Sequence, residues 1–263
     1  MRPQDTENIL GGIGSNPRDK IFEDEDDDEN ENDLGSPMNP DELCRALHLA
    51  SPALPIGSFS YSQGLETAVE LGLIRNEEDA GKWIADGLTE IIARCEAPVV
   101  AFVYRACRSD PSVDSLPEIA HWNDWFLASR ESMELRRETE QMGWSLLQLA
   151  YALKWITPTA VTNKLEPIAF PTAFALSAAG LALSERTTLT GFCFSWLETQ
   201  VAGAIKLVPL GQTAGHRILT RCRTKVPVAV NSVAETTDIS SWAPMLGILS
   251  ARHESQYSRL FRS

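Results

Sequence analysis

Residues 47–66 read Leu-His-Leu-Ala-Ser-Pro-Ala-Leu-Pro-Ile-Gly-Ser-Phe-Ser-Tyr-Ser-Gln-Gly-Leu-Glu. This stretch combines a helix end, a turn with two prolines and a glycine, and a loop of hydroxyl and aromatic side chains that leads into another helix. Pro52 and Pro55 each fix their own backbone and restrict the residue before them, so the turn costs little entropy to order. It can therefore hold Phe59 and Tyr61 in set directions, which suits contact with a partner better than catalysis.

Two predicted helices flank this turn. Asn39 is a favourable N-cap residue and Pro40 fits the first helical position, so the first helix should cover about 40–50. Ser60 and Gln63 have capping-box spacing and predict the start of a second helix. A glycine follows inside this second helix, at Gly64, where it costs about 1 kcal/mol relative to alanine. We attribute Gly64 to the close approach of another backbone.

The rest of the chain also has helical periodicity, without convincing alternation of apolar and polar residues. The segment Val226–Val230 is too short and too interrupted by proline to require a strand. The sequence predicts one all-α domain of about ten helices over residues 39–263, behind a disordered acidic arm at residues 1–38. The further helices are expected at 76–95, 98–106, 117–126, 131–155, 172–184, 191–207, 211–223 and 239–250.

The charge is concentrated at the N-terminal end. Residues 1–40 carry a net charge of −9 out of −13, which leaves −4 for the remainder. The carboxylates of the acidic run 23–33 repel one another, so the run should be disordered. It is either a solvated spacer or a segment that attracts cations or a basic partner. No basic stripe is available for nucleic acid, and no apolar run is long enough for a membrane helix. Without a secretory apolar segment either, we expect an intracellular protein.

No motif in the chain specifies catalysis or a metal site. The serines after Gly57 lack the lysine of a phosphate-binding loop and the spacing of a nucleophile elbow, so a serine hydrolase is the weakest alternative. Cys44 and His48 could face a soft metal from one helix, but two ligands do not close a site. The five cysteines are scattered, without a Cys-x-x-Cys pair, and indicate buried thiols. We therefore expect no bound cofactor.

The C-terminal segment 252–263 interleaves aromatic and basic residues. Tyr257 and Phe261 alternate with arginines such as Arg259, and these residue types supply most anchors of protein interfaces. His253 sits among polar neighbours and should form hydrogen bonds at such an interface. Alternatively, the segment simply packs on its own domain. The charged run 134–140 is expected to be a solvated, self-paired helix face, with a partner-facing role as the alternative.

Several ordered segments together resemble the UreF family of urease accessory proteins. They are the turn ending at Glu66, the Glu-Leu-Arg-Arg-Glu-Thr-Glu-Gln-Met-Gly run 134–143, Trp-Leu-Glu at 196–198, Lys-Leu-Val-Pro-Leu-Gly-Gln at 206–212, and the closing Arg-Leu-Phe-Arg-Ser. The chain departs from the family pattern at Thr199 and His216, and the acidic arm lies outside the resemblance.

This resemblance implies an all-α, cytosolic, non-enzymatic dimer that bridges UreD (also called UreH) and the GTPase UreG, in a complex that delivers nickel to apo-urease. It implies that Glu66 and Lys206 face UreG and that the loop with Phe59 and Tyr61 is presented to a partner. The residues implied on the UreD/UreH side are Arg252, His253, Tyr257, Arg259, Leu260 and Phe261. The main alternative is a metallochaperone that binds nickel directly through Cys44, His48 or the acidic arm.

Overall fold

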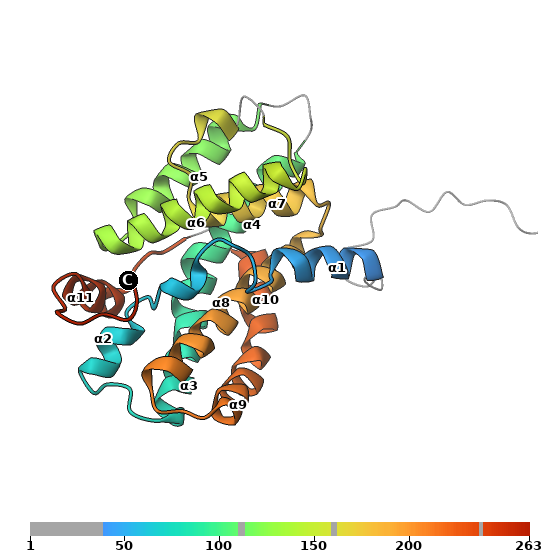
Figure 1. Ribbon diagram of the computed structural model, residues 1–263. Helices are drawn as coiled ribbons and strands as arrows, with labels where there is room; N and C mark the ends of the chain where they lie inside the picture. The colour runs from blue at the N-terminus through green and yellow to red at the C-terminus, as the bar shows by residue number, and fades with distance from the viewer. Residues whose placement is uncertain (1–38, 110–113, 159–161, 237–238) are drawn as a thin grey trace, which may run out of the picture. The chain divides into compact units, whose positions relative to one another are not determined.

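The computed structural model describes residues 39–109, 114–158, 162–236 and 239–263 (Figure 1). Within these ranges the chain is helical and contains no strand, which confirms the predicted all-α class. The acidic arm lies outside the described residues, so its disorder and the division at residue 38 stay predictions. The α-helices are α1 Pro40–Leu49, α2 Leu65–Glu70, α3 Glu77–Gly87, α4 Ala97–Arg108, α5 Leu116–Ala128, α6 Met133–Ala152, α7 Phe170–Gly180, α8 Glu185–Leu207, α9 Gln212–Cys222, α10 Val226–Glu235 and α11 Pro244–His253.

Capping residues set the starts of α1 and α8, of which the sequence placed only the first correctly. The Asn39 side chain accepts the backbone N–H of Asp41 at 3.0 Å, and α1 begins at the next residue, as predicted. The helix α8 begins six residues before its predicted start because Ser184 caps it through the N–H of Thr187.

The helices α3 and α4 form one continuous run rather than two separated helices. A π-helical segment, Leu88–Glu96 (η2), joins them, and both junction residues keep right-handed helical backbone angles. Pro98 does not interrupt the run, because it lies in the first turn of α4, where a missing N–H is tolerated.

The segment around Val226 forms no strand, as expected, but it is the helix α10, which was not among the predicted helices. Pro227 lies in its first turn and is therefore compatible with it. Val226, Ala229, Val230 and Val233 are all buried, at the spacing of one helix face. The helical spacing of these apolar residues is visible in the sequence, but Pro227 is equally compatible with a helix break.

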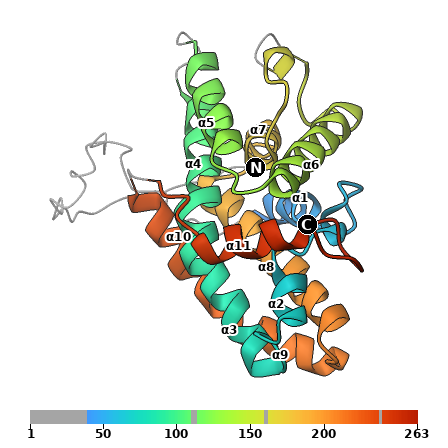
Figure 2. The ribbon, with the colours of Figure 1, turned by 90° about the vertical axis from the view of Figure 1, so that its left-hand side faces the viewer.

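The core lies between two groups of helices that share the α3–η2–α4 run (Figures 1 and 2). The helices α5 and α7 pack on α4, and α6 packs on α7, whereas α9 packs on α3 and on α8. Phe170, Phe174 and Phe192 pack ring against ring where α7 meets α8. Gly143 permits the backbone before α7 to approach α6, since a Cβ there would lie 2.3 Å from the carbonyl oxygen of Ile168.

Short 3-10 turns complete the described chain, at Ser58–Ser60 (η1), Thr162–Lys164 (η3) and Arg223–Lys225 (η4). None of the helices among the described residues combines the length and the apolar character needed to cross a bilayer.

Candidate functional site: the docked C-terminal segment

The turn identified in the sequence ends at Gly64, which adopts a left-handed backbone with φ of +81°. The helix α2 therefore begins at Leu65, and the predicted start at Ser60 is wrong because only one 3-10 turn forms there. Gly64 is not inside a helix, so its backbone angle, which favours glycine, replaces the predicted explanation. A Cβ at Gly64 would also lie 3.3 Å from Leu246, a side chain of α11 rather than a backbone atom.

The carboxylate of Glu66 is buried, with 7% of the residue exposed, and it binds the C-terminal segment. It accepts the backbone N–H of Leu260 at 2.6 Å and that of Phe261 at 2.9 Å. Its Oε2 also lies 3.1 Å from Nε2 of His253. The carboxylate therefore satisfies two backbone amides of its own chain, and the contact of Glu66 with a partner stays a prediction.

His253 is fully buried between two carboxylates from different helices. Its Nδ1 lies 2.6 Å from Oε2 of Glu134, on α6, opposite the Glu66 contact. The other oxygen of Glu134 accepts a hydrogen bond from Arg259 at 2.7 Å. Both ring nitrogens of His253 therefore meet carboxylates of the same chain, and its role at an interface stays a prediction.

A second set of contacts fixes the end of the segment. The N–H and the hydroxyl of Ser62 both donate to the carbonyl oxygen of Ser263, at 2.9 and 2.5 Å. The hydroxyl of Ser263 donates to Glu138 at 2.6 Å, and Gln63 donates to the other oxygen of Glu138 at 2.7 Å. The C-terminal segment is therefore ordered on its own domain, which was the alternative interpretation of its sequence. Figure 1 shows its end beside α2 and α11.

We call this arrangement the tail-docking cluster: the buried residues Glu66, Glu138 and His253 and the partly buried Glu134, with the segment 257–263. The sequence did not reveal Glu134 and Glu138 as members. Only part of the expected self-paired face exists, in the ion pair of Arg136 and Glu140 at 2.9 Å. The i, i+4 spacing of Glu134 and Glu138, next to the buried Leu135 and Met142, was the available signal.

The carboxyl group of Glu138 is buried, and its pKa is raised. Burial raises the pKa of this carboxyl group to about 7, although its hydrogen bonds with Ser263 and Gln63 favour the charged form. Burial, together with the charge of Glu138, also raises the pKa of Tyr61. Tyr61 is 7% exposed, so its side chain packs within this chain, and its contact with a partner stays a prediction.

An exposed rim surrounds the cluster. The ammonium of Lys206 lies 5.9 Å from the ring of Phe59 and 5.6 Å from that of Phe261, within the range of cation–π attraction. Lys206 and Phe59 are exposed, whereas Phe261 is buried. Tyr257 and Leu260 are exposed too, as are Arg252 and Arg259. The resemblance assigns Lys206 to the UreG side and Phe261 to the UreD/UreH side, yet in this structure the two side chains lie next to each other.

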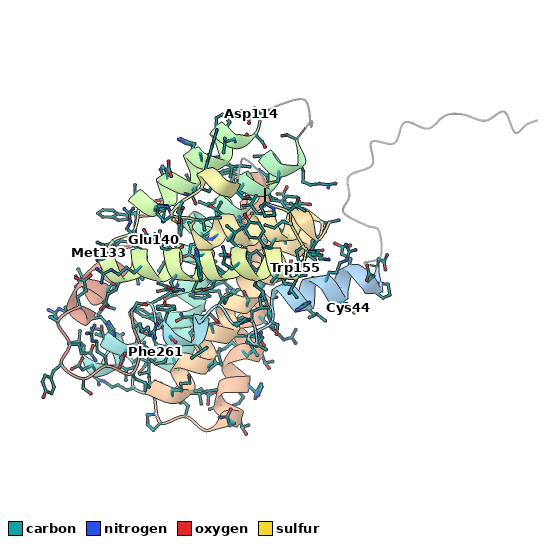
Figure 3. The ribbon with its side chains drawn as sticks, turned by 45° about the horizontal axis from the view of Figure 1, so that its top comes forward. Cys44, Asp114, Met133, Glu140, Trp155 and Phe261 are labelled. Atoms are coloured by element: carbon teal, nitrogen blue, oxygen red, sulfur yellow. The ribbon has the colours of Figure 1, made fainter. Side chains whose placement is uncertain are left out.

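No metal site forms where the sequence suggested one. Across the described ranges, no group of three or more His, Cys, Asp or Glu side chains could hold a metal ion. Cys44 is exposed, and the ring of His48 packs edge-on against Trp155, beyond the end of α6 (Figure 3). Cys95, Cys193 and Cys222 are the buried thiols that were predicted, while Cys44 corrects that expectation.

The geometry also opposes a nucleophilic role for Ser62, in the turn. The hydroxyl of Ser62 donates to Ser263, and both nitrogens of His253 are engaged by Glu66 and Glu134. A Ser–His pair would need one of those nitrogens to accept the hydroxyl proton.

Comparison with known proteins identifies the family. The UreF family model matches residues 74–223, which is more than half of the chain. The chain belongs to the UreF family. It is 48% identical over 229 residues to a urease accessory protein UreF of Cupriavidus taiwanensis, an alignment that covers 84% of this chain and 98% of the relative. The corresponding protein of Cupriavidus pinatubonensis is 49% identical over 230 residues, with the same coverage.

The match to the UreF family runs from just before α3 to the end of α9, and so includes Lys206. The turn at 58–66 and the C-terminal segment lie outside the matched range. The tail-docking cluster therefore joins residues within the matched range to residues on either side of it.

Proposed function

We propose that this chain is a non-enzymatic scaffold in urease maturation, which bridges UreD/UreH and the GTPase UreG while nickel passes to apo-urease. Its relatives carry the name urease accessory protein, and 98% of their length is covered by the alignment. In this proposal the nickel is handled by the complex, and the chain itself contributes surfaces and geometry. The chain acts as a homodimer in the cytoplasm.

The tail-docking cluster is the observation that carries this proposal. The buried residues Glu66 and His253, together with the partly buried Glu134, hold an otherwise irregular segment in one conformation. This order presents the exposed side chains of Tyr257 and Leu260 on a fixed backbone. Preordered aromatic, aliphatic and arginine side chains favour binding, because little entropy is lost when the partner arrives.

The exposure of each side chain supports the roles that we propose for it. We assign Lys206 and Phe59 to the contact with UreG, since both are exposed at the same edge of the cluster. We assign Arg252, Tyr257, Arg259 and Leu260 to the contact with UreD/UreH. The buried residues Glu66, Tyr61, His253 and Phe261 support these surfaces from below rather than touching a partner.

Co-purification separates the two surfaces. Tyr257→Ala and Arg259→Ala should reduce capture of UreD/UreH, whereas Lys206→Glu should reduce capture of UreG. Lys82→Glu, an exposed lysine on α3 away from the cluster, is the matched control for the charge reversal. Circular dichroism should show unchanged helix content in each variant. Capture of UreD/UreH that does not respond to either tail substitution would contradict the assignment.

A further inference from the structure

A second surface lies outside the tail-docking cluster, in a groove between the α3–η2 run and the start of α11. The groove has a volume of about 300 Å³. Three tryptophans line it, Trp83 from α3, Trp196 from α8 and Trp242 just before α11. Asp86 and Glu90 lie along its edge. Three indoles with carboxylates beside them form an environment that attracts cations.

The central indole is fixed in place before any ligand arrives. A Cβ at Gly87 would lie 2.8 Å from Cη2 of Trp196, so the glycine provides the space in which this ring lies against α3. The Nε1 of Trp196 donates to Oε1 of Gln63 at 2.7 Å, which sets the plane of the ring. A preordered aromatic wall lowers the entropy cost of binding.

The outer wall is strongly exposed. Trp242 is 82% exposed, and Met245, in the first turn of α11, is exposed as well. The segment that carries Trp242 is tied to the opposite wall, because the N–H of Ser240 donates to the carbonyl oxygen of Arg94 at 3.0 Å. Large apolar side chains exposed around a groove with a polar rim are typical of an interaction site.

The charge at the rim indicates what the groove accepts. Glu90 forms an ion pair with Arg94 at 3.0 Å, so its charge is largely compensated. Asp86 is exposed and has no ion pair with any described residue. A guanidinium group can stack on indole faces and pair with such a carboxylate at the same time, and it loses less hydration than an ammonium.

We propose that this groove binds an arginine side chain that a short apolar segment of a partner protein presents. The arginine stacks between Trp196 and Trp242 and pairs with Asp86. The flanking apolar residues of the partner cover Met245 and the indole of Trp83. This proposal does not rest on the role of the tail-docking cluster, since the groove has its own walls and its own charge.

Two peptide probes test the proposal by fluorescence anisotropy with the full chain. The first is a fluorescein-labelled peptide of sequence Gly-Ser-Leu-Arg-Leu-Ser-Gly, and the second replaces its arginine with citrulline, a neutral isostere. We expect the arginine peptide to bind about fivefold or more tightly than the citrulline peptide at physiological salt. Equal binding of both peptides, or no binding of the arginine peptide, would overturn the proposal.

Variants then locate the binding. Trp242→Ala should weaken the arginine peptide about tenfold, and Asp86→Asn about threefold. Both residues are exposed, so the fold should be unaffected. Trp144→Ala, an exposed tryptophan of α6 that lines a different surface, is the matched control and should bind as the parent does. Binding that is lost in Trp144→Ala but retained in Trp242→Ala would also overturn the proposal.

Discussion

The substitution Glu66→Gln tests how the C-terminal segment is held. The carboxylate of Glu66 accepts two backbone N–H groups, from Leu260 and Phe261, and both of its oxygens are used. A glutamine offers one acceptor oxygen and turns an NH₂ group toward the other amide. Hydrogen bonds to charged groups contribute about 1.5–3 kcal/mol each, so the docked state should lose roughly 3 kcal/mol in all.

This loss should appear as detachment of the segment rather than as global unfolding, because irregular terminal segments can open locally. A loss of about 3 kcal/mol corresponds to roughly 100-fold faster exchange of the two amides, since about 1.4 kcal/mol is one factor of ten. Hydrogen exchange read by NMR at Leu260 and Phe261 measures it directly. Glu70→Gln, at an exposed position of the same helix, is the control. Exchange rates within twofold of the parent in Glu66→Gln would refute the reasoning.

Three further predictions concern the fold, its pH dependence and the exposed rim. Gly143→Ala should lower the free energy of unfolding by about 2–3 kcal/mol, because the added Cβ would meet the backbone before α7. Gly211→Ala is the control and should cost little, since no atom lies within 4 Å of the added Cβ. Urea denaturation of both variants measures the difference. Burial raises the pKa of Glu138 from 4.5 to about 7, so the folded chain holds a proton there that the unfolded chain has lost, and the free energy of unfolding should fall by up to about 3 kcal/mol as the pH rises from 4.5 to 7. Glu138→Gln should flatten that fall, and an unchanged slope would show that another group titrates. Lys206→Met removes the cation over two rings and should shift the melting temperature by only about 2 °C, while reducing capture of UreG; full capture would remove Lys206 from the proposed contact.

Helix starts were predictable where a local signal was complete. Asn39 and Pro40 define the beginning of α1 within their own neighbourhood, and the structure keeps it. The errors occurred where a proline or glycine has two meanings. Pro227 lies in the first turn of a helix, and Gly64 precedes one, but sequence alone does not distinguish these positions from a helix break and a helix interior.

The site was predictable as a set of segments but not as an arrangement. The turn, Lys206 and the C-terminal segment were all singled out, yet which of their side chains face inward depends on contacts between residues far apart in the chain. The buried carboxylate of Glu66 accepts the amides of Leu260 and Phe261, which lie 194 and 195 positions further along the chain. No local sequence pattern around Glu66 predicts such distant contacts. The same holds for Glu134, whose partners His253 and Arg259 lie in the C-terminal region.

Restoration of urease in cells that lack this chain tests the central claim most directly. The cells are supplied with the full chain or with a chain that ends at Gln256, and both urease activity and the nickel content of the purified urease are measured. We expect active, nickel-loaded urease with the full chain and inactive, nickel-poor urease with the shortened chain, when the full and shortened chains are present at equal levels. Full activity and nickel content without residues 257–263 would contradict it.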